Sequence, residues 1–112
     1  MDPERIAAAV RGCPGVAGLS AGQFGEVASY LPGRRVNGVR ITEDGVETHV
    51  VLWYGIPVDE AVVQIRSAVR AVAPEAAAVD VVVADLALAG DEEPGEPGGV
   101  PAGGRGAGDR GP

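Results

Sequence analysis

The stretch "EDGVETHVVLWYGIP", residues 43–57, contains a turn, a strand and the start of a helix in succession. Asp44 and Gly45 form the dipeptide that suits a tight hairpin turn. The residues after this turn alternate, which places one set on each face of a predicted strand. One face holds Val46, Thr48, Val50, Leu52 and Tyr54, and the other holds Glu47, His49, Val51 and Trp53. "GIP" at 55–57 ends the strand and opens the next element.

The segments on either side complete a strand–turn–strand–helix–strand unit. Before the turn, in "VNGVRIT" (36–42), Val39 and Ile41 alternate with smaller or polar residues, as expected for the first arm of the hairpin. After it, residues 58–72 have an apolar stripe at helical spacing, and Pro74 stops the helix. "AVDVVVADL" (78–86) predicts a last strand. The faces that must meet predict Val50, Leu52, Ile65 and Val69 as core residues.

The N-terminal part adds one helix and one strand. Asp2 is a suitable N-cap, Pro3 fits the first helical position, and Gly12 ends the helix. "GVAGL" (15–19) predicts a short strand, whereas residues 20–30 are interpreted as a loop, or as a loop with one helical turn. The predicted order is therefore α-β-β-β-α-β. This order indicates an α+β fold with a small mixed sheet, both helices on one face and the other face open.

Composition divides the 112 residues into one domain and a tail. Residues 1–89 are expected to form a single α+β domain. In residues 90–112, glycine and proline account for 13 positions and Val100 is the only large apolar residue. Such a segment cannot bury enough surface to offset the entropy lost on ordering, so it is predicted to be a disordered, acidic tail.

Charge and targeting signals limit the function classes. The formal net charge is -7, which repels nucleic acid phosphate and anionic lipid unless a local basic patch exists. The single cysteine excludes an internal disulfide. The sequence has no recognisable signal peptide and no run long enough for a membrane helix. A cytoplasmic protein without direct membrane insertion is therefore expected.

Catalytic and metal-binding sets are weak in this chain. A Cys13–His49 nucleophile and base pair is conceivable, but a lone cysteine more often packs in a core. His49 and Glu47 offer two ligands where a structural zinc site needs about four. We therefore predict no enzymatic activity, no catalytic residues, no metal and no cofactor.

The remaining signals are on the surface. Trp53 is the only tryptophan and shares a strand face with His49; Arg40 is expected to join that face from the neighbouring strand. Tryptophan and arginine are enriched at interfaces. The predicted partner-binding surface therefore comprises Arg40, His49 and Trp53, edged by Arg34 and Arg35 of "LPGRR".

Two alternatives remain open for these residues. Trp53 could instead be covered by residues 20–31, and the two adjacent arginines could be solvated loop charges. From another function class, Arg34, Arg35, Arg40 and Trp53 could form the basic and stacking surface of a small nucleic-acid-binding module, against which the net charge argues.

Three stretches together carry a family resemblance: "PGVAGL" (14–19), "GEVASYLPGRRVNGVRI" (25–41) and "VETHVVLWYGIPV" (46–58). With "IRSAVRAV" and "VDVVVADL" after them, the chain resembles the alkaline shock protein family of envelope stress response proteins, in particular its short, high-GC branch. The resemblance covers residues 5–86. It implies a non-enzymatic cytoplasmic protein of small α+β fold with a role in cell-envelope homeostasis. Some members are held at the inner face of the membrane by a small membrane-anchor protein and some self-assemble, so either is an expected partner.

Overall fold

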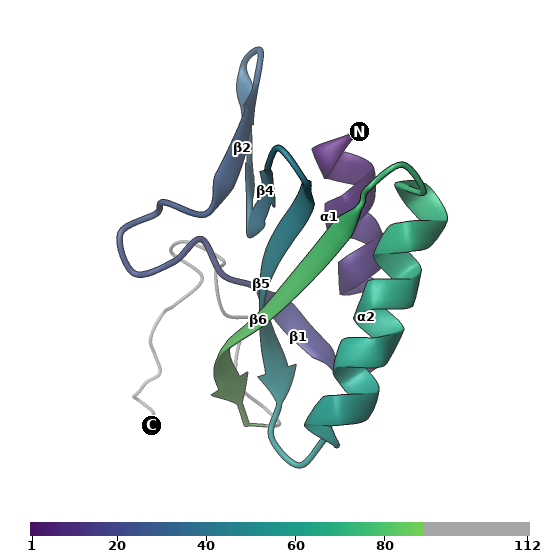
Figure 1. Ribbon diagram of the computed structural model, residues 1–112. Coiled ribbons are helices and arrows are strands. Elements are labelled where there is room, and N and C mark those ends of the chain that lie inside the picture. The colour runs from purple at the N-terminus through teal and green to yellow at the C-terminus, as the bar shows by residue number, and fades with distance from the viewer. Residues whose placement is uncertain (89–112) are drawn as a thin grey trace.

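The computed structural model describes residues 1–88, and the predicted disordered tail, 90–112, lies outside them (Figure 1). The elements are α1 (Pro3–Arg11), β1 (Val16–Leu19), β2 (Ala28–Leu31), β3 (Arg34–Asn37), β4 (Val39–Ile41), β5 (Gly45–Trp53), α2 (Val58–Val72) and β6 (Ala78–Ala87). The α+β class predicted from the sequence is confirmed.

Strand β5 is the centre of a four-stranded mixed sheet. β6 runs parallel to β5 along one edge, over nearly its whole length. The other edge is shared by two short antiparallel strands: β4 pairs with the first half of β5, at Val39↔Thr48, and β1 pairs with the second half, at Val16↔Leu52. The parallel β5–β6 pair requires a crossover connection, and α2 supplies it.

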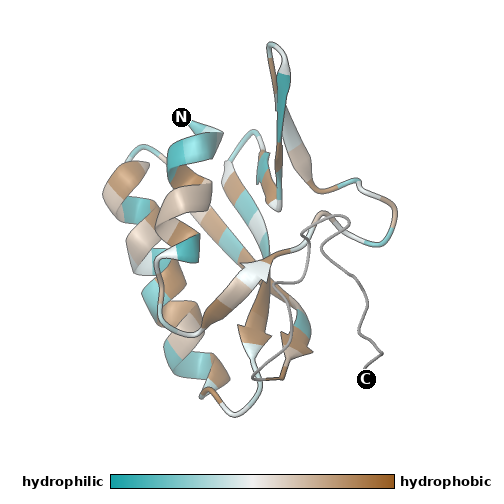
Figure 2. Cartoon of the chain, turned by 180° about the vertical axis from the view of Figure 1, so that it is seen from behind, coloured by the Kyte–Doolittle hydropathy of each residue, from teal (hydrophilic) through white to brown (hydrophobic). Residues whose placement is uncertain are grey.

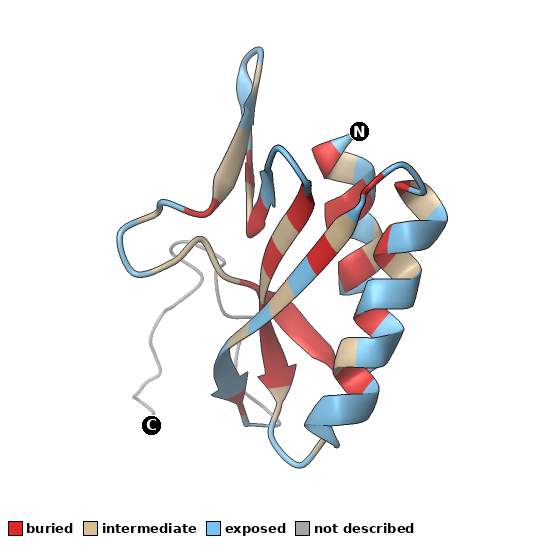
Figure 3. Ribbon diagram, in the orientation of Figure 1, coloured by how far each residue is buried: buried red, intermediate tan, exposed pale blue. Residues whose placement is uncertain are grey.

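Both helices pack on the same face of this sheet, which makes that face the core (Figure 1). The predicted core residues are confirmed, because Val50, Leu52, Ile65 and Val69 are all 0% exposed. Figure 3 shows the buried positions along β5 and on the sides of the helices that meet it. Bands of apolar and polar residues alternate along the strands (Figure 2), as the two-residue period predicts. Tyr54, assigned to the core face by alternation, is exposed because β5 ends at Trp53.

The region before β4 differs from the prediction. Residues 20–30 were expected to be a loop and 36–42 a single strand. Instead, β2 and β3 form a separate two-stranded antiparallel sheet that projects beyond the main sheet, so five strands precede α2 rather than three (Figure 1). The hairpin is held by a tertiary contact that local pattern does not reveal: Leu31 and Val36 pack against the core cluster.

Gly38 separates β3 from β4. Its φ is 85°, a conformation that L side chains rarely adopt. Its N–H donates to the Val27 carbonyl, and its carbonyl accepts from the N–H of His49 and from the buried hydroxyl of Thr48. A Cβ at position 38 would lie 2.6 Å from the Cβ of Leu19. The chain can therefore change direction here, between two sheets, only because residue 38 is glycine.

The helix ends match the sequence signals. The Asp2 side chain accepts a hydrogen bond from Glu4 N, and Pro3 is the first residue of α1. In α2, Asp59 and Glu60 lie in the first turn and Arg70 in the last, which suits the helix dipole. Neither helix in residues 1–88 has the length and apolar character needed to cross a membrane.

Candidate functional site

The sheet face opposite the helices carries the side chains that alternation assigned to it. Glu47, His49, Val51 and Trp53 of β5 lie on this side, which we call the open face. Ala17, Val51 and Ala87 form a small buried apolar cluster on it, and Trp53 is partly buried against that cluster. The cluster comes from β1, β5 and β6, so Trp53 packs on the sheet itself. Trp53 is thus half-buried on the face opposite the main core.

A charged network occupies the other end of the open face. The Glu47 carboxylate accepts hydrogen bonds from His49 Nε2 and from Arg40 Nη2, each at 2.6 Å. Arg40 comes from β4, where it pairs directly with Glu47 across the strands. The hydrogen bond from His49, followed by that from Arg40, lowers the pKa of Glu47. Glu47 therefore stays ionised and aligns both partners on the sheet surface.

Residues 20–27 form a compact loop beside this network. Ser20 N donates to the His49 carbonyl, which anchors the loop to β5. Within the loop, Val27 N donates to the Ala21 carbonyl, and the Glu26 carboxylate accepts from Phe24 N. Hydrogen bonds from its own backbone N–H and from that of Phe24 lower the pKa of Glu26. The loop thus presents a fixed carboxylate at the edge of the open face.

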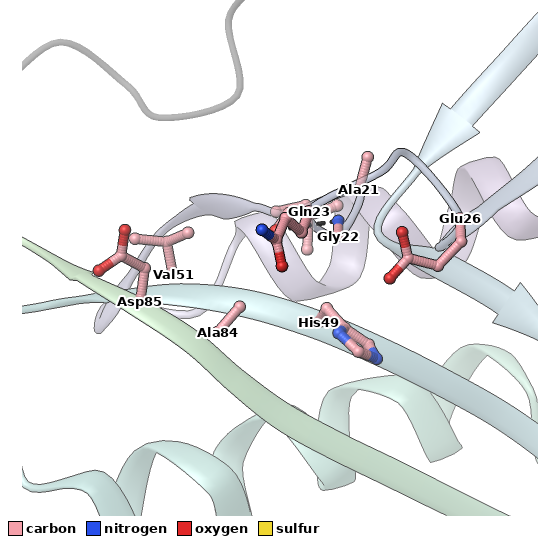
Figure 4. Close-up of a pocket in the computed structure, with 10 residues that line it drawn as sticks. Ala21, Gly22, Gln23, Glu26, His49, Val51, Ala84 and Asp85 are labelled. Carbon is pink, nitrogen blue, oxygen red and sulfur yellow. Dashed lines mark hydrogen bonds between the residues drawn. The ribbon is translucent and has the colours of Figure 1, made fainter.

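Loop and sheet together enclose a hollow of about 590 Å³. Figure 4 shows His49 and Glu26 at one end and Asp85 of β6 at the other, with Gln23 above the sheet between them. Val51 and Ala84 form part of its base, so the hollow is apolar below and polar around its rim. The base of the hollow can hold an apolar group of a ligand, and the carboxylates of Glu26 and Asp85 at the rim can bind basic or amide groups of the same ligand.

The structure unites some of the predicted site residues and separates others. Arg40 and His49 meet at Glu47, and Trp53 lies farther along the same strand. Arg34 and Arg35 are neighbours in β3, so their side chains point to opposite sides of the hairpin. The two arginines therefore do not lie on the same side of the hairpin.

Each of the two arginines has its own partner. Arg34 Nη1 lies 3.1 Å from Glu4 Oε2 on α1, on the helix side of the molecule. Arg35 Nη2 donates to the Gly25 carbonyl at 2.6 Å, and its guanidinium lies 5.5 Å from the centre of the Tyr30 ring. Only Arg35 is thus attached to the loop that borders the open face.

The conceivable Cys13–His49 pair is not assembled. Cys13 is buried in the core cluster on the helix side, whereas His49 lies on the open face. Burial raises the pKa of the Cys13 thiol, which disfavours the reactive thiolate. Within the part of the chain that the structure describes, no group of three or more His, Cys, Asp or Glu side chains could hold a metal ion.

Sequence reasoning missed Glu26, Gln23 and Asp85 as residues of the hollow. The loop 20–27 lacks a period, so nothing in it predicts where Glu26 points. Asp85 reaches the open face because the β5–β6 register shifts between Val50 and Val51. Phe24, 85% exposed at the loop, was not singled out either. Glu47 was recognised as a neighbour of His49, and strand alternation was the signal.

Comparisons with protein-family models, with curated proteins and with solved structures give no match for this chain.

Proposed function

We propose that this chain is a non-enzymatic protein-interaction module that binds a segment of a partner protein on its open face. The observation that carries the proposal is the hollow of about 590 Å³ between the sheet and residues 20–27, with half-buried Trp53 on the same face. A sheet face that holds an apolar base, a tryptophan and fixed carboxylates offers both contact area and specificity to a protein segment.

The charges on this face favour a protein over a nucleic acid. Arg40 and Arg34, two of the three arginines that a nucleic-acid surface would use, are each paired with a carboxylate. Glu26 and Asp85 on the rim of the hollow would repel phosphate. The same carboxylates would attract a segment with basic or amide side chains.

The biological role we propose follows the resemblance to alkaline shock proteins: cell-envelope homeostasis in the cytoplasm, with the domain held at the inner face of the membrane through its partner. A small membrane-anchor protein is the partner that this role favours, and self-association is the alternative. In either case, Trp53 would be the apolar anchor and the Arg40–Glu47–His49 network would set the orientation of the bound segment.

Replacement of Trp53 by alanine tests the proposal. We expect Trp53→Ala to weaken partner binding by about 2 kcal/mol or more, as for a central interface tryptophan. Tyr54→Ala is the matched control, because Tyr54 is the next residue, is aromatic and is 70% exposed beyond the end of β5. The partner would first be captured from lysate with the membrane fraction retained. Binding of the purified partner to both variants would then be measured.

Circular dichroism of each variant separates a binding defect from misfolding. A folded Trp53→Ala variant that binds the partner as tightly as the wild type would show that the open face is not the interface. If Trp53→Ala unfolds, His49→Ala gives the same test at the other end of the face.

A further inference from the structure

Strand β6 lies at the edge of the main sheet. It pairs with β5 on one side, and no other strand within residues 1–88 pairs with its second side. Ten residues form this strand, Ala78–Ala87, and none of them is proline or lysine, the residues that commonly protect exposed edges. An edge of this kind presents a row of backbone donors and acceptors to the surroundings.

Two hydrogen bonds at the start of β6 define which of its backbone groups point outward. Ala78 N donates to the Asp44 carbonyl, so residue 78 faces the β5 side. Backbone groups alternate along a strand, and therefore Val79, Val81 and Val83 direct their N–H and C=O groups away from β5. Consistent with this, the Val79 carbonyl accepts a hydrogen bond from Arg66 Nε of α2 at 3.2 Å.

The usable part of this edge is short and bounded. Arg66 occupies the acceptor of Val79 at one end. At the other end the register shifts, so that Val50 pairs with Val83 but Val51 pairs with Asp85, and the outward alternation is interrupted. Val81 and Val83 therefore form the open centre, which is long enough for an added strand of about four or five residues.

The side chains along this edge define the chemistry of its partner. Asp80 and Asp85 are both exposed and bracket Val82, which is 40% exposed, on the open-face side of β6. In an antiparallel pair of two copies with Val81 opposite Val83, each Asp80 would lie close to the Asp85 of the other copy. Each chain also has a net charge of -7. Like charges oppose self-pairing, whereas a segment with basic ends matches the same pattern.

We propose that the outer edge of β6, centred on Val81 and Val83, binds an extended segment of another protein as an additional strand. The segment has an apolar centre and lysine or arginine side chains that meet Asp80 and Asp85. This edge shares Asp85 with the rim of the hollow on the open face, but its backbone groups point away from β5, and it does not depend on the function proposed for that hollow. Its affinity comes from main-chain hydrogen bonds, and its selectivity comes from the two carboxylates.

Two peptides probe this edge directly. Both have alternating valine and threonine in the centre; one has lysine at each end and the other has glutamate. Binding to the full chain would be measured by fluorescence anisotropy, at peptide concentrations where the free peptides are monomeric. We expect the lysine-ended peptide to bind at least about ten-fold more tightly, because two favourable charge contacts replace two repulsive ones.

Amide hydrogen exchange of the wild-type chain locates the bound peptide. The amides of Val81 and Val83 point outward and are expected to exchange quickly in the free chain and slowly with the peptide bound. The amide of Val82 points toward β5 and serves as the internal control, since it is expected to be protected in both states. Binding without new protection at Val81 and Val83 would overturn the proposal.

Two variants test the hydrogen bonds and the charges separately. Val83→Pro removes the outward backbone N–H of residue 83, which does not bond to β5. We expect this change to lower the affinity for the lysine-ended peptide by about ten-fold. Asp80→Asn should lower the affinity for the lysine-ended peptide by about three-fold. Asp59→Asn on α2 makes the same change of charge away from the edge and should leave this affinity unchanged. If Val83→Pro misfolds, the exchange experiment decides.

Other outcomes would contradict the proposal in recognisable ways. Equal affinity for the two peptides would remove the charge requirement. A wild-type dimer in sedimentation that becomes monomeric in Val83→Pro would mean that a second copy, and not a basic segment, occupies the edge. Trp53→Ala should leave peptide binding unchanged, so failure of the open-face proposal and failure of this one are distinguishable.

Discussion

Glu47 and His49, two residues apart on β5, are joined by a 2.6 Å contact between Oε2 and Nε2 on the face of the sheet opposite α1 and α2. Arg40 reaches the other oxygen of the same carboxylate from β4. A carboxylate that is four-fifths buried and receives two such bonds stabilises the fold only while it is ionised.

This relationship predicts how stability depends on pH. Because folding lowers the pKa of Glu47 below its ordinary 4.5, its contribution is complete above pH 4.5 and is lost as the pH falls through the folded-state value. Glu47→Gln should therefore cost about 1 kcal/mol near pH 6. The difference from the wild type should shrink as the pH falls below 4.5.

Urea unfolding between pH 3 and 6 would measure that difference. Glu43→Gln is the control, since Glu43 is exposed in the turn before β5. A Glu47→Gln penalty that stays constant over this pH range would contradict the assigned role of the carboxylate.

Gly38 should be far less tolerant of alanine than Gly33. Both have positive φ, 85° and 74°, so either substitution has a backbone cost of about 1–2 kcal/mol. A Cβ at Gly33 meets nothing within 4 Å, whereas one at Gly38 lies 2.6 Å from Leu19 Cβ. Thermal unfolding of Gly38→Ala should therefore show the larger loss. Equal losses would mean that the contact with Leu19 relaxes freely.

Leu52 tests the core that β5 forms with the helices. It is 0% exposed, and Leu52→Ala should destabilise the domain by about 2–5 kcal/mol. Leu86→Ala deletes the same atoms from a residue that is 47% exposed and should cost less than about 1 kcal/mol. Denaturant unfolding of both variants gives the two costs, and similar values would contradict the burial assigned to Leu52.

Truncation after Ala89 tests the predicted tail. The composition of residues 90–112, rich in glycine and proline, offers almost nothing to a core. The melting temperature should therefore stay within about 4 °C of that of the full chain, a change equivalent to roughly 1 kcal/mol for a domain of this size. A larger drop in differential scanning calorimetry would show that the segment stabilises the domain.

The elements that have a regular period or a specific end signal can be predicted from the amino-acid sequence alone. Asp2 and Pro3 mark the start of α1, Asp44 and Gly45 mark the hairpin turn, and the apolar stripe of residues 58–72 marks α2. The alternation along β5 predicts Leu52 in the core and Glu47 beside His49. Adjacent side chains on a strand point to opposite faces, and side chains two residues apart share a face.

Contacts between segments that are distant in the chain cannot be predicted from these local patterns. The hairpin β2–β3 depends on contacts of Leu31 and Val36 with a core built from other elements, so its short strands left no readable pattern. The position of Glu26 follows from loop hydrogen bonds, and that of Asp85 from a register shift in β6. Adjacent Arg34 and Arg35 looked like one site in the sequence, but strand geometry sends them to α1 and to the loop at Gly25. Local periodicity specifies which way a residue points, whereas packing between distant segments specifies what it contacts.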